Sequence, residues 1–442
     1  MVFSSFVFLF GFLPAALLFY YLAPRRWRNG VLLWLSLFFY FWGEPGYLWL
    51  MAAVIGMNFL LALPLEKYRK KWLLALGVGA NLVCLGWFKY RPLLGLTGAA
   101  LPMGISFYIF QAMSYLVDVY RGDAPAQKKI TAFATYIALF PQLIAGPIIR
   151  YGELAPQLES RRENPGDFSS GSQLFLVGLS KKLLLANPMG LLWENLQGTP
   201  GTVAAWGGLV AFAFQIYYDF SGYSDMARGL GRMFGFRFPR NFNYPYTAQS
   251  VTDFWRRWHM SLSGWFREYV YIPLGGSRRG KGRQIGNIFL VWALTGLWHG
   301  ASWNFLLWGL YYALLLTAEK LFALRWLERL PRLLRQGCTF FWVLLGWALF
   351  YFEDVGALTA FLPRLFSGAE TPAAGWACLW SELIYLVSAA VCATPLLRRW
   401  LLRSRGRTLV RWGRVAAAGV LLLLCLGALA RQGYNPFLYF RF

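Results

Sequence analysis

The sequence has 442 residues, of which 58% are hydrophobic and only 14% are charged. A water-soluble core cannot enclose so much apolar surface, so this composition excludes a soluble globular protein and indicates a membrane protein. The net charge of +24 does not indicate a nucleic-acid partner, because the basic residues lie in short blocks between apolar runs and form no continuous stripe.

Long apolar runs recur from one end of the chain to the other, and about 20 apolar residues are enough to cross a bilayer as a helix. We therefore predict an all-α, polytopic bundle of about 10–12 transmembrane helices with additional re-entrant helices, in a single domain over residues 1–442. The first run is kept as a span because Arg25 to Arg28 follow it, whereas a signal peptide has its basic residues ahead of the apolar stretch. The clearest runs predict spans at 3–23, 47–64, 72–90, 131–149, 303–324 and 381–397.

Five blocks of basic residues separate the apolar runs and predict the orientation of the chain. Cytoplasmic loops are enriched in Lys and Arg, so we expect all five blocks to be cytoplasmic and the N-terminus to be outside. Anionic lipid headgroups then supply the counter-charge. The blocks are Arg25, Arg26 and Arg28; Lys67, Arg69, Lys70 and Lys71; Arg278, Arg279, Lys281 and Arg283; Arg325, Arg329, Arg332 and Arg335; and seven arginines between Arg398 and Arg414.

Polar or broken segments interrupt the apolar runs of the first half. The Gly-Glu-Pro-Gly sequence at 43–46 breaks any helix and predicts a tight helical hairpin. Two prolines and a glycine break the segment 140–147, which at membrane depth is tolerated only against protein or a cavity. The polar stretch 150–172 predicts a surface loop, and 353–380 is a further loop-like stretch.

A dense polar cluster at 211–240 predicts a re-entrant or broken helix that lines a polar funnel, because lipid cannot hydrogen-bond such groups. Asp219 and Asp225 fit paired acid–base carboxylates, and they equally fit structural ion pairs with a neighbour such as Arg228. The candidate funnel residues of this segment are Gln215, Tyr218, Asp219, Ser221, Tyr223, Ser224 and Asp225.

The protein has only two histidines, His259 and His299, and both lie between residues 251 and 304. A helix over 252–267 would place His259 on an inward face with Trp255, Leu262 and Phe266. Over 284–300, four-residue steps place His299 at the end of a stripe formed by Asn287, Val291 and Thr295. Gly296 and Gly300 would let another helix approach closely.

A neutral imidazole can serve as a general base, because histidine has an ordinary pKa of about 6.5. Each histidine taken alone also fits a hydrogen-bonded packing role. Two histidines and five scattered cysteines have no metal-ligand spacing, so we predict no metal site. Gly275 and Gly276, followed by the basic run 278–283, fit a phosphate cradle, although any cytoplasmic loop has a similar composition.

The chain resembles the membrane-bound O-acyltransferases over nearly its whole length, and most closely the bacterial branch that O-acetylates alginate. One matching motif would be weak evidence, whereas several in the same order are specific. The matching segments are 101–121, 140–151, 214–239, 253–263, 271–276, 297–304 and the terminal Asn-Pro-Phe-Leu-Tyr-Phe at 435–440.

The resemblance implies a helical membrane fold with a central funnel or tunnel. It assigns a catalytic role to His299 in the Trp-His-Gly motif and a second motif position to His259, which is an asparagine in many eukaryotic members. With the funnel residues named above, the further candidates for tunnel or substrate contacts are Asp253, Trp255, Arg256, Arg257, Arg267, Thr295, Trp298 and Asn304.

The resemblance also implies an activity in the cell membrane. A multi-pass protein of this branch passes an acetyl group from a cytoplasmic thioester donor, such as acetyl-CoA, towards the hydroxyls of an extracellular polysaccharide, often through an SGNH-hydrolase-like partner. No bound cofactor is implied. Three alternatives remain: D-alanyl or other acyl transfer from a carrier protein, an acyl-group transporter, and a scaffold for a secreted acyltransferase.

The donor of such a reaction would carry negative charge, because CoA contains a phosphorylated nucleotide. We expect a cytoplasmic mouth rimmed by basic residues to attract it and to hold its phosphates. An acidic carrier protein would suit the same rim. The expected rim is Arg256, Arg257, Arg267, Arg278 and Arg279.

Overall fold

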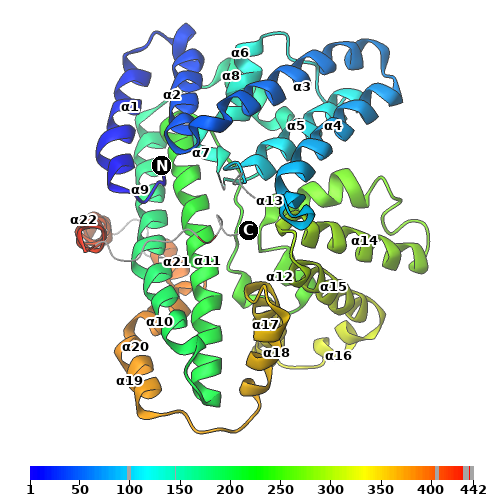
Figure 1. Cartoon of the computed structure of the whole chain (residues 1–442). Helices are drawn as coiled ribbons and strands as arrows, with labels where there is room; N and C mark the ends of the chain where they lie inside the picture. Colours follow the sequence, from blue (N-terminus) through cyan, green and yellow to red (C-terminus); the bar gives the residue numbers. More distant parts are fainter. Residues whose placement is uncertain (97–100, 145, 404–407, 432–437, 439–442) are drawn as a thin grey trace. The chain divides into compact units, whose positions relative to one another are not determined.

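The computed structural model of the protein describes residues 1–96, 101–144, 146–403, 408–431 and 438. In this part of the chain every regular element is a helix or a helical turn, which confirms the predicted all-α class (Figure 1). The contacts divide the chain into two compact units. The first contains Met1–Phe175 and Tyr223–Arg240, and the second contains Leu176–Gly222 and Asn241–Phe442. The single domain over 1–442 stays a prediction.

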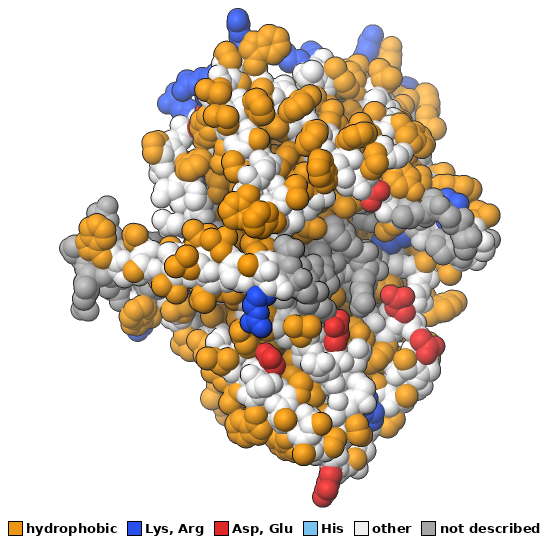
Figure 2. All heavy atoms as spheres, turned by 60° about the vertical axis from the view of Figure 1, so that its left-hand side comes forward, with side chains coloured by type: hydrophobic (Ala, Val, Ile, Leu, Met, Phe, Trp, Pro, Cys, Tyr) orange, Lys and Arg blue, Asp and Glu red, His pale blue; other side chains and the backbone are white. Residues whose placement is uncertain are grey.

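The helices identify a multi-pass membrane protein. Within the described residues, five helical segments are long and apolar enough to cross a bilayer. Figure 2 shows one face of the molecule on which hydrophobic side chains predominate, as expected for a surface that meets lipid. The five segments are Pro45–Tyr68, Lys71–Tyr90, Pro165–Gln197, Trp303–Glu328 and Arg332–Tyr351, and a pair bent by 53°, Ala373–Ser381 and Leu383–Cys392, adds a sixth if it is one span. Three shorter apolar helices are Phe8–Leu22, Val355–Leu365 and Val415–Ala430.

The predicted spans at 47–64, 72–90 and 303–324 are confirmed. The span predicted over 131–149 is wrong, because the helix that begins at Ile130 ends at Ala138 and a separate short helix covers Phe140–Leu143. The predicted surface loop at 150–172 is also wrong. Helices cover Tyr151–Ser160 and Pro165–Ser180, and the second of these begins a membrane span with Pro165 at its first position.

The first unit contains the N-terminal helices. Glu163 joins the first two of them, because its carboxylate forms an ion pair with Arg28 at 2.7 Å and accepts a hydrogen bond from Tyr20 at 2.5 Å. The elements, with η for 3₁₀- and π-helical turns, are η1 (Phe8–Phe12), α1 (Leu13–Leu22), η2 (Arg25–Trp27), α2 (Arg28–Gly43), η3 (Pro45–Tyr47), α3 (Leu48–Tyr68), α4 (Lys71–Tyr90), η4 (Arg91–Leu94), α5 (Ile105–Arg121), α6 (Ile130–Ala138), α7 (Phe140–Leu143), α8 (Tyr151–Ser160) and the first part of α9 (Pro165–Ser180).

The second unit contains both histidines. Its elements after α9 are η5 (Lys181–Ala186), α10 (Asn187–Gln197), the first part of α11 (Thr202–Met233), η6 (Pro245–Thr247), α12 (Val251–Trp255), α13 (Met260–Phe266), η7 (Arg267–Tyr271), α14 (Lys281–His299), α15 (Trp303–Ala318), η8 (Glu319–Ala323), α16 (Leu324–Glu328), α17 (Arg332–Tyr351), α18 (Val355–Phe361), η9 (Leu362–Leu365), α19 (Ala373–Ser381), α20 (Leu383–Cys392), α21 (Leu396–Arg403) and α22 (Thr408–Ala430).

The hairpin of α14 and α15 is closely packed at Gly296. A side chain at this position would collide with the backbone carbonyl of Phe305, and one at Gly300 would collide with the Phe305 ring. The predicted close approach of another helix at these glycines is therefore confirmed. The packing holds the end of α14, and with it His299, against the start of α15.

The predicted break in the helix over 211–240 is wrong. Helix α11 continues without interruption through 32 residues to Met233, and irregular structure begins only after it. The two aspartates need no break in the helix, because basic side chains balance their charges. Asp219 pairs with Lys182 at 2.7 Å, and Asp225 pairs with Arg228 at 3.0 Å.

Candidate active site

His259 lies in a sharp turn of the backbone between α12 and α13. Its φ is +43° and its ψ is 55°, a left-handed conformation that few residues other than glycine adopt. The continuous helix predicted over 252–267 is therefore wrong, since α12 ends at Trp255 and α13 starts at Met260. Such strain persists only where the surroundings determine the backbone firmly, and it is common at functional sites.

The segment 241–243 holds this turn from both sides. The Asn243 N–H donates to the Arg257 carbonyl at 2.9 Å, and the Met260 N–H donates to the Asn241 carbonyl at 2.9 Å. The side-chain oxygen of Asn241 accepts from the N–H of Ser261 at 3.0 Å. These bonds lie on either side of His259 in the chain, so they fix the backbone from which its ring projects.

Helix α12 is anchored at its other end by Glu319, whose buried carboxylate accepts hydrogen bonds from the N–H groups of Val251 and, at 2.8 Å, Thr252. A carboxylate at a helix N-terminus satisfies backbone donors that would otherwise have no partner. The position of the His259 turn is therefore tied to η8, within a membrane-spanning segment of the same unit.

The His259 ring is buried among aromatic rings and is only 2% exposed. Its centroid lies 4.7 Å from that of Phe220, edge to face, and 6.3 Å from that of Trp298. Among the described residues, neither ring nitrogen has a hydrogen-bond partner. Burial lowers the pKa of His259 from 6.5 to about 3, because the charged form is poorly solvated there. The ring is therefore a neutral imidazole with one donor and one acceptor directed at its surroundings.

His299 is the last residue of α14 and is half-buried. Aromatic rings surround it, with centroids at 5.0 Å for Trp298, 5.1 Å for Trp308 and 5.1 Å for Phe350. The C-terminal end of a helix carries partial negative charge, which stabilises a cation by about 0.3–1 kcal/mol. An imidazolium formed at His299 therefore has a favourable place, whereas one formed at His259 is opposed by burial.

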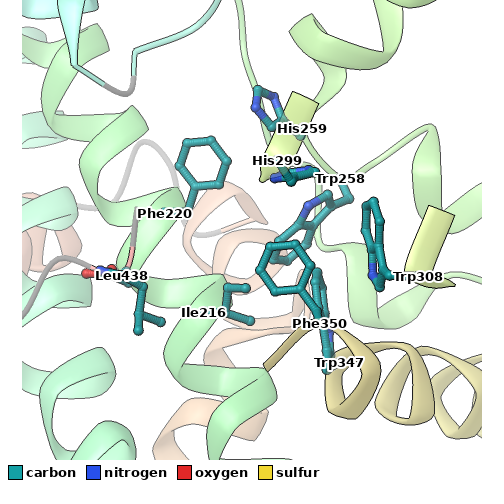
Figure 3. A pocket seen from close by; sticks show the side chains of 10 residues that line it. Ile216, Phe220, Trp258, His259, His299, Trp308, Trp347, Phe350 and Leu438 are labelled. Carbon is teal, nitrogen blue, oxygen red and sulfur yellow. The ribbon is translucent and has the colours of Figure 1, made fainter. Parts of the chain in front are cut away.

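Both histidines line one cavity of the second unit, with about 440 Å³ of empty space including its open end. Figure 3 shows the two imidazole rings together, with Phe220 to one side and Trp308 to the other. Most of the surrounding side chains are apolar, so the cavity is a place from which bulk water is largely excluded. The residues that line it are Ile216, Asp219, Phe220, Trp258, His259, His299, Trp308, Trp347, Phe350 and Leu438.

Asp219 is the acidic residue of this cavity. Its carboxylate pairs with the Lys182 ammonium at 2.7 Å, and both side chains are only 3% exposed. The other carboxylate oxygen accepts a hydrogen bond from the Leu438 N–H at 2.8 Å. The carboxylate is thus committed to structural contacts. Apart from Leu438, the matching segment at 435–440 lies outside the described residues.

Comparison with known proteins identifies the family. The family model described as MBOAT, membrane-bound O-acyltransferase family, matches residues 35–353. The chain belongs to the membrane-bound O-acyltransferase family. It is an O-acyltransferase, as the sequence motifs predict.

The relatives of this O-acyltransferase act on different polymers. The probable alginate O-acetylase AlgI of Pseudomonas putida is 38% identical, and the match covers both chains completely. The peptidoglycan O-acetyltransferase of Helicobacter pylori is 33% identical over 79% of this chain and 77% of its own length. The teichoic acid D-alanyltransferase of Bacillus subtilis is 28% identical over 56% of this chain and 68% of its own.

The structure brings only three of the predicted site residues, Asp219, His259 and His299, into the lining of the cavity. Trp298 lies beside both histidine rings. Gln215, Tyr218 and Ser221 are buried on the α11 segment of the same unit, where the Tyr218 hydroxyl donates to the Ala389 carbonyl at 2.5 Å. Tyr223, Ser224 and Asp225 belong to the first unit, and the Asp225–Arg228 ion pair favours the structural interpretation of Asp225.

The other predicted residues have contacts of their own. The Thr295 hydroxyl donates to the Val291 carbonyl at 2.8 Å, and the Asn304 amide donates to the Phe350 carbonyl at 3.0 Å. Trp255 packs in an aromatic cluster, 4.6 Å from Trp292 between ring centroids. Asp253 forms an ion pair with Arg257 at 2.8 Å, while Arg256 and Arg267 are exposed. None of these seven predicted residues lines the cavity that holds the histidines.

Two residues that position the site were not singled out from the sequence. Lys182 stands in an apolar stretch, and an ionisable residue within a membrane span is a functional candidate by default, so this signal was present. Asn241 stands in a polar segment of ordinary composition, and nothing in the sequence distinguishes it. The aromatic lining residues Trp308 and Phe350 are likewise indistinguishable from other aromatic residues of the spans.

We expect His259→Asn to retain more acyl-transfer activity than His259→Leu. Asparagine keeps a donor and an acceptor and tolerates a positive φ, whereas leucine has neither property. The measurement is the turnover of purified, folded protein, normalised to the amount that elutes as a monodisperse peak. If His259→Asn were as inactive as a His299 variant while still binding the donor, His259 would carry the proton transfer itself.

The burial of His259 also predicts how the stability of the protein depends on pH. The lowered pKa means that between about pH 3 and 6.5 the unfolded chain binds a proton at His259 that the folded protein does not bind, so this residue makes stability fall as the pH falls through that window. Above pH 6.5 the effect is absent. Lowering the pH from 7 to 4 should therefore reduce the Tm of the natural protein more than that of His259→Asn. If the Tm of both proteins fell equally with pH, the burial of a neutral His259 would be contradicted.

Proposed function

We propose that this protein transfers an acetyl group from a cytoplasmic thioester donor towards hydroxyl groups of a cell-envelope polysaccharide. The observation that carries the proposal is the placement of the only two histidines against one narrow, mostly apolar cavity. Acyl transfer to a hydroxyl needs a proton acceptor at the point of attack, and a cavity with little water keeps the thioester from hydrolysis.

In the proposed mechanism, the acceptor hydroxyl attacks the thioester carbonyl carbon while His299 accepts its proton. The new C–O bond forms, the C–S bond breaks, and the departing sulfur takes the proton back from the His299 imidazolium as the thiol. The end of α14 stabilises that imidazolium while it exists. His259, with a pKa too low to hold a proton at neutral pH, orients the donor or the acceptor by hydrogen bonds.

The acceptor is proposed from the names of the relatives. Alginate and peptidoglycan, named for two of them, are polymers of sugars with free hydroxyls. We propose that the acceptor is a polysaccharide of this class. The acetyl group reaches it directly or through an extracytoplasmic SGNH-hydrolase-like partner. We also propose that the protein lies in the cell membrane. Transfer of D-alanine from a carrier protein is the alternative that the Bacillus subtilis relative favours, although its match to this chain is lower and shorter.

The donor assay distinguishes these activities. Purified protein in nanodiscs is incubated with radiolabelled acetyl-CoA and, separately, with an acyl-loaded carrier protein. We expect release of free CoA that depends on His299. Turnover of the carrier alone would reject acetyl-CoA as the donor. A transporter or a scaffold would leave the thioester intact in both incubations, so the appearance of free thiol separates an enzyme from those two alternatives.

A further inference from the structure

A second cavity of the second unit is lined by arginines from three separate parts of the chain. It contains about 810 Å³ of empty space including its open end. None of its lining residues is acidic. They are Asn243, Tyr244, Thr247, Arg257, Arg332, Pro395, Arg398 and Arg399.

Within the described residues, the positive charge of this cavity is balanced only at Arg257. Arg257 forms an ion pair with Asp253 at 2.8 Å. For Arg332, Arg398 and Arg399, the described residues provide no ion-pair partner, and all three are exposed. Like charges around one hollow repel each other, and an anion bound between them removes this cost and gains charge-assisted hydrogen bonds. The arrangement therefore favours a ligand with several negative charges.

The arginines lie at the ends of membrane-spanning segments. Arg332 is the first residue of the span Arg332–Tyr351, and Arg398 and Arg399 belong to α21, which follows the bent pair that ends at Cys392. Arginines of the last two basic blocks of the sequence thus line one cavity. At the ends of membrane-spanning segments, such side chains can reach the lipid headgroups and the aqueous phase.

Residues close together in the chain line the two cavities. We call them the histidine cavity, which holds His259 and His299, and the arginine cavity. Arg257 precedes His259 by two residues, so their Cα atoms lie within about 7.6 Å of each other. The hydrogen bond from the Asn243 N–H to the Arg257 carbonyl joins two lining residues of the arginine cavity and is also one of the bonds that fix the His259 turn. Helix α12, which leads into this turn, packs against α17, which begins with Arg332 (Figure 1).

We propose that the arginine cavity binds the phosphate groups of a phosphorylated acyl donor, such as the nucleotide of an acyl-CoA, and directs its thioester end towards His259 and His299. This inference rests on the proposed function and specifies how the donor is recognised. The arginines of this cavity differ from the basic rim expected from the sequence. Arg257 remains, Arg332, Arg398 and Arg399 join it, and Arg256, Arg267, Arg278 and Arg279 do not line the cavity.

The test compares two donors that share a thioester and differ in phosphate. For Arg332→Gln, Arg398→Gln and Arg399→Gln, we expect the KM for acetyl-CoA to rise about tenfold or more per substitution, with kcat little changed. The KM for acetyl-pantetheine, which has no phosphate, should stay the same. Arg325→Gln is the matched control, because it removes one exposed arginine of the same basic block that does not line the cavity.

Equal changes for both donors, or no change for either, would overturn the phosphate site. If the natural protein turned over neither donor, the proposed function would be at fault, and the site would still be tested by binding of adenosine 3′,5′-bisphosphate to purified protein. Loss of that binding in the arginine variants and its retention in Arg325→Gln would support the site, whereas unaltered binding would overturn it.

A lipid headgroup offers the same phosphate chemistry, and the choice of bilayer separates the two sources. The assays are run in nanodiscs of phosphatidylcholine alone and with added phosphatidylglycerol. An increase in the KM for acetyl-CoA in both bilayers supports the donor site. If the variants instead changed only the response to phosphatidylglycerol, the cavity would hold a headgroup and the proposal would be wrong.

Discussion

Replacement of His299 by alanine or glutamine is expected to lower the turnover number of acyl transfer by about 10²- to 10⁴-fold at every pH, the usual contribution of a general base. His299 combines a place on the cavity with the favourable end of α14. Glutamine retains hydrogen-bonding capacity but cannot accept the acceptor's proton, so it should be as inactive as alanine. The measurement is release of free CoA by purified protein, with membrane abundance and monodispersity as checks of folding.

A matched control is Leu294→Ala on the same helix, because Leu294 is 37% exposed and does not line the cavity. This variant should turn over the donor at nearly the rate of the natural protein. If both His299 variants also acylated normally, the cavity would be a passive conduit. The better account would then be a transporter, or a scaffold for an enzyme outside the membrane.

The sequence was sufficient to predict the fold class and to single out the two histidines that line one cavity. Apolar content is a property of whole segments, so it identifies spans such as 47–64 whatever their detailed packing. Histidine is so scarce in this chain that both residues stood out without any knowledge of structure. Predictions of this kind depend on composition and on single residues, and they need no long-range contact.

The failures share a different physical cause, because they depend on contacts between distant parts of the chain. The carboxylate of Asp219 favoured a broken helix, yet Lys182 supplies the counter-charge from another helical segment and α11 stays intact. The left-handed backbone of His259 results from hydrogen bonds to the segment 241–243, which no helical periodicity contains. Local pattern therefore favoured a continuous helix where tertiary contacts impose a turn.

The basic residues show the same dependence on distant contacts. From the sequence, Arg332 and the arginines after 398 are separate blocks that predict the orientation of the chain. Their convergence with Arg257 on one cavity depends on the packing of helices far apart in the sequence. Proximity along the chain instead favoured Arg256 and Arg267, which are exposed and do not line that cavity.

Removal of one partner of the Lys182–Asp219 pair is expected to destabilise the protein by about 3–5 kcal/mol, because it takes the opposite charge away from a charge in a buried place. Both side chains are only 3% exposed, and their charged atoms are 2.7 Å apart. Lys182→Met leaves a buried carboxylate, and Asp219→Asn leaves a buried ammonium but keeps an acceptor for the Leu438 N–H. Thermal unfolding in detergent micelles should show a large fall in Tm for each.

The double variant Lys182→Met with Asp219→Asn should be more stable than either single variant, since neither side chain then carries a charge. Such non-additivity is the signature of a directly coupled pair, whereas separate contributions would simply add. Turnover provides a second readout, because Asp219 lines the histidine cavity and the neutral pair keeps the hydrogen bond to Leu438. A stable double variant with activity restored above the single variants would assign the ion pair a structural role. A stable but inactive one would show that the charge of Asp219 itself takes part in acyl transfer.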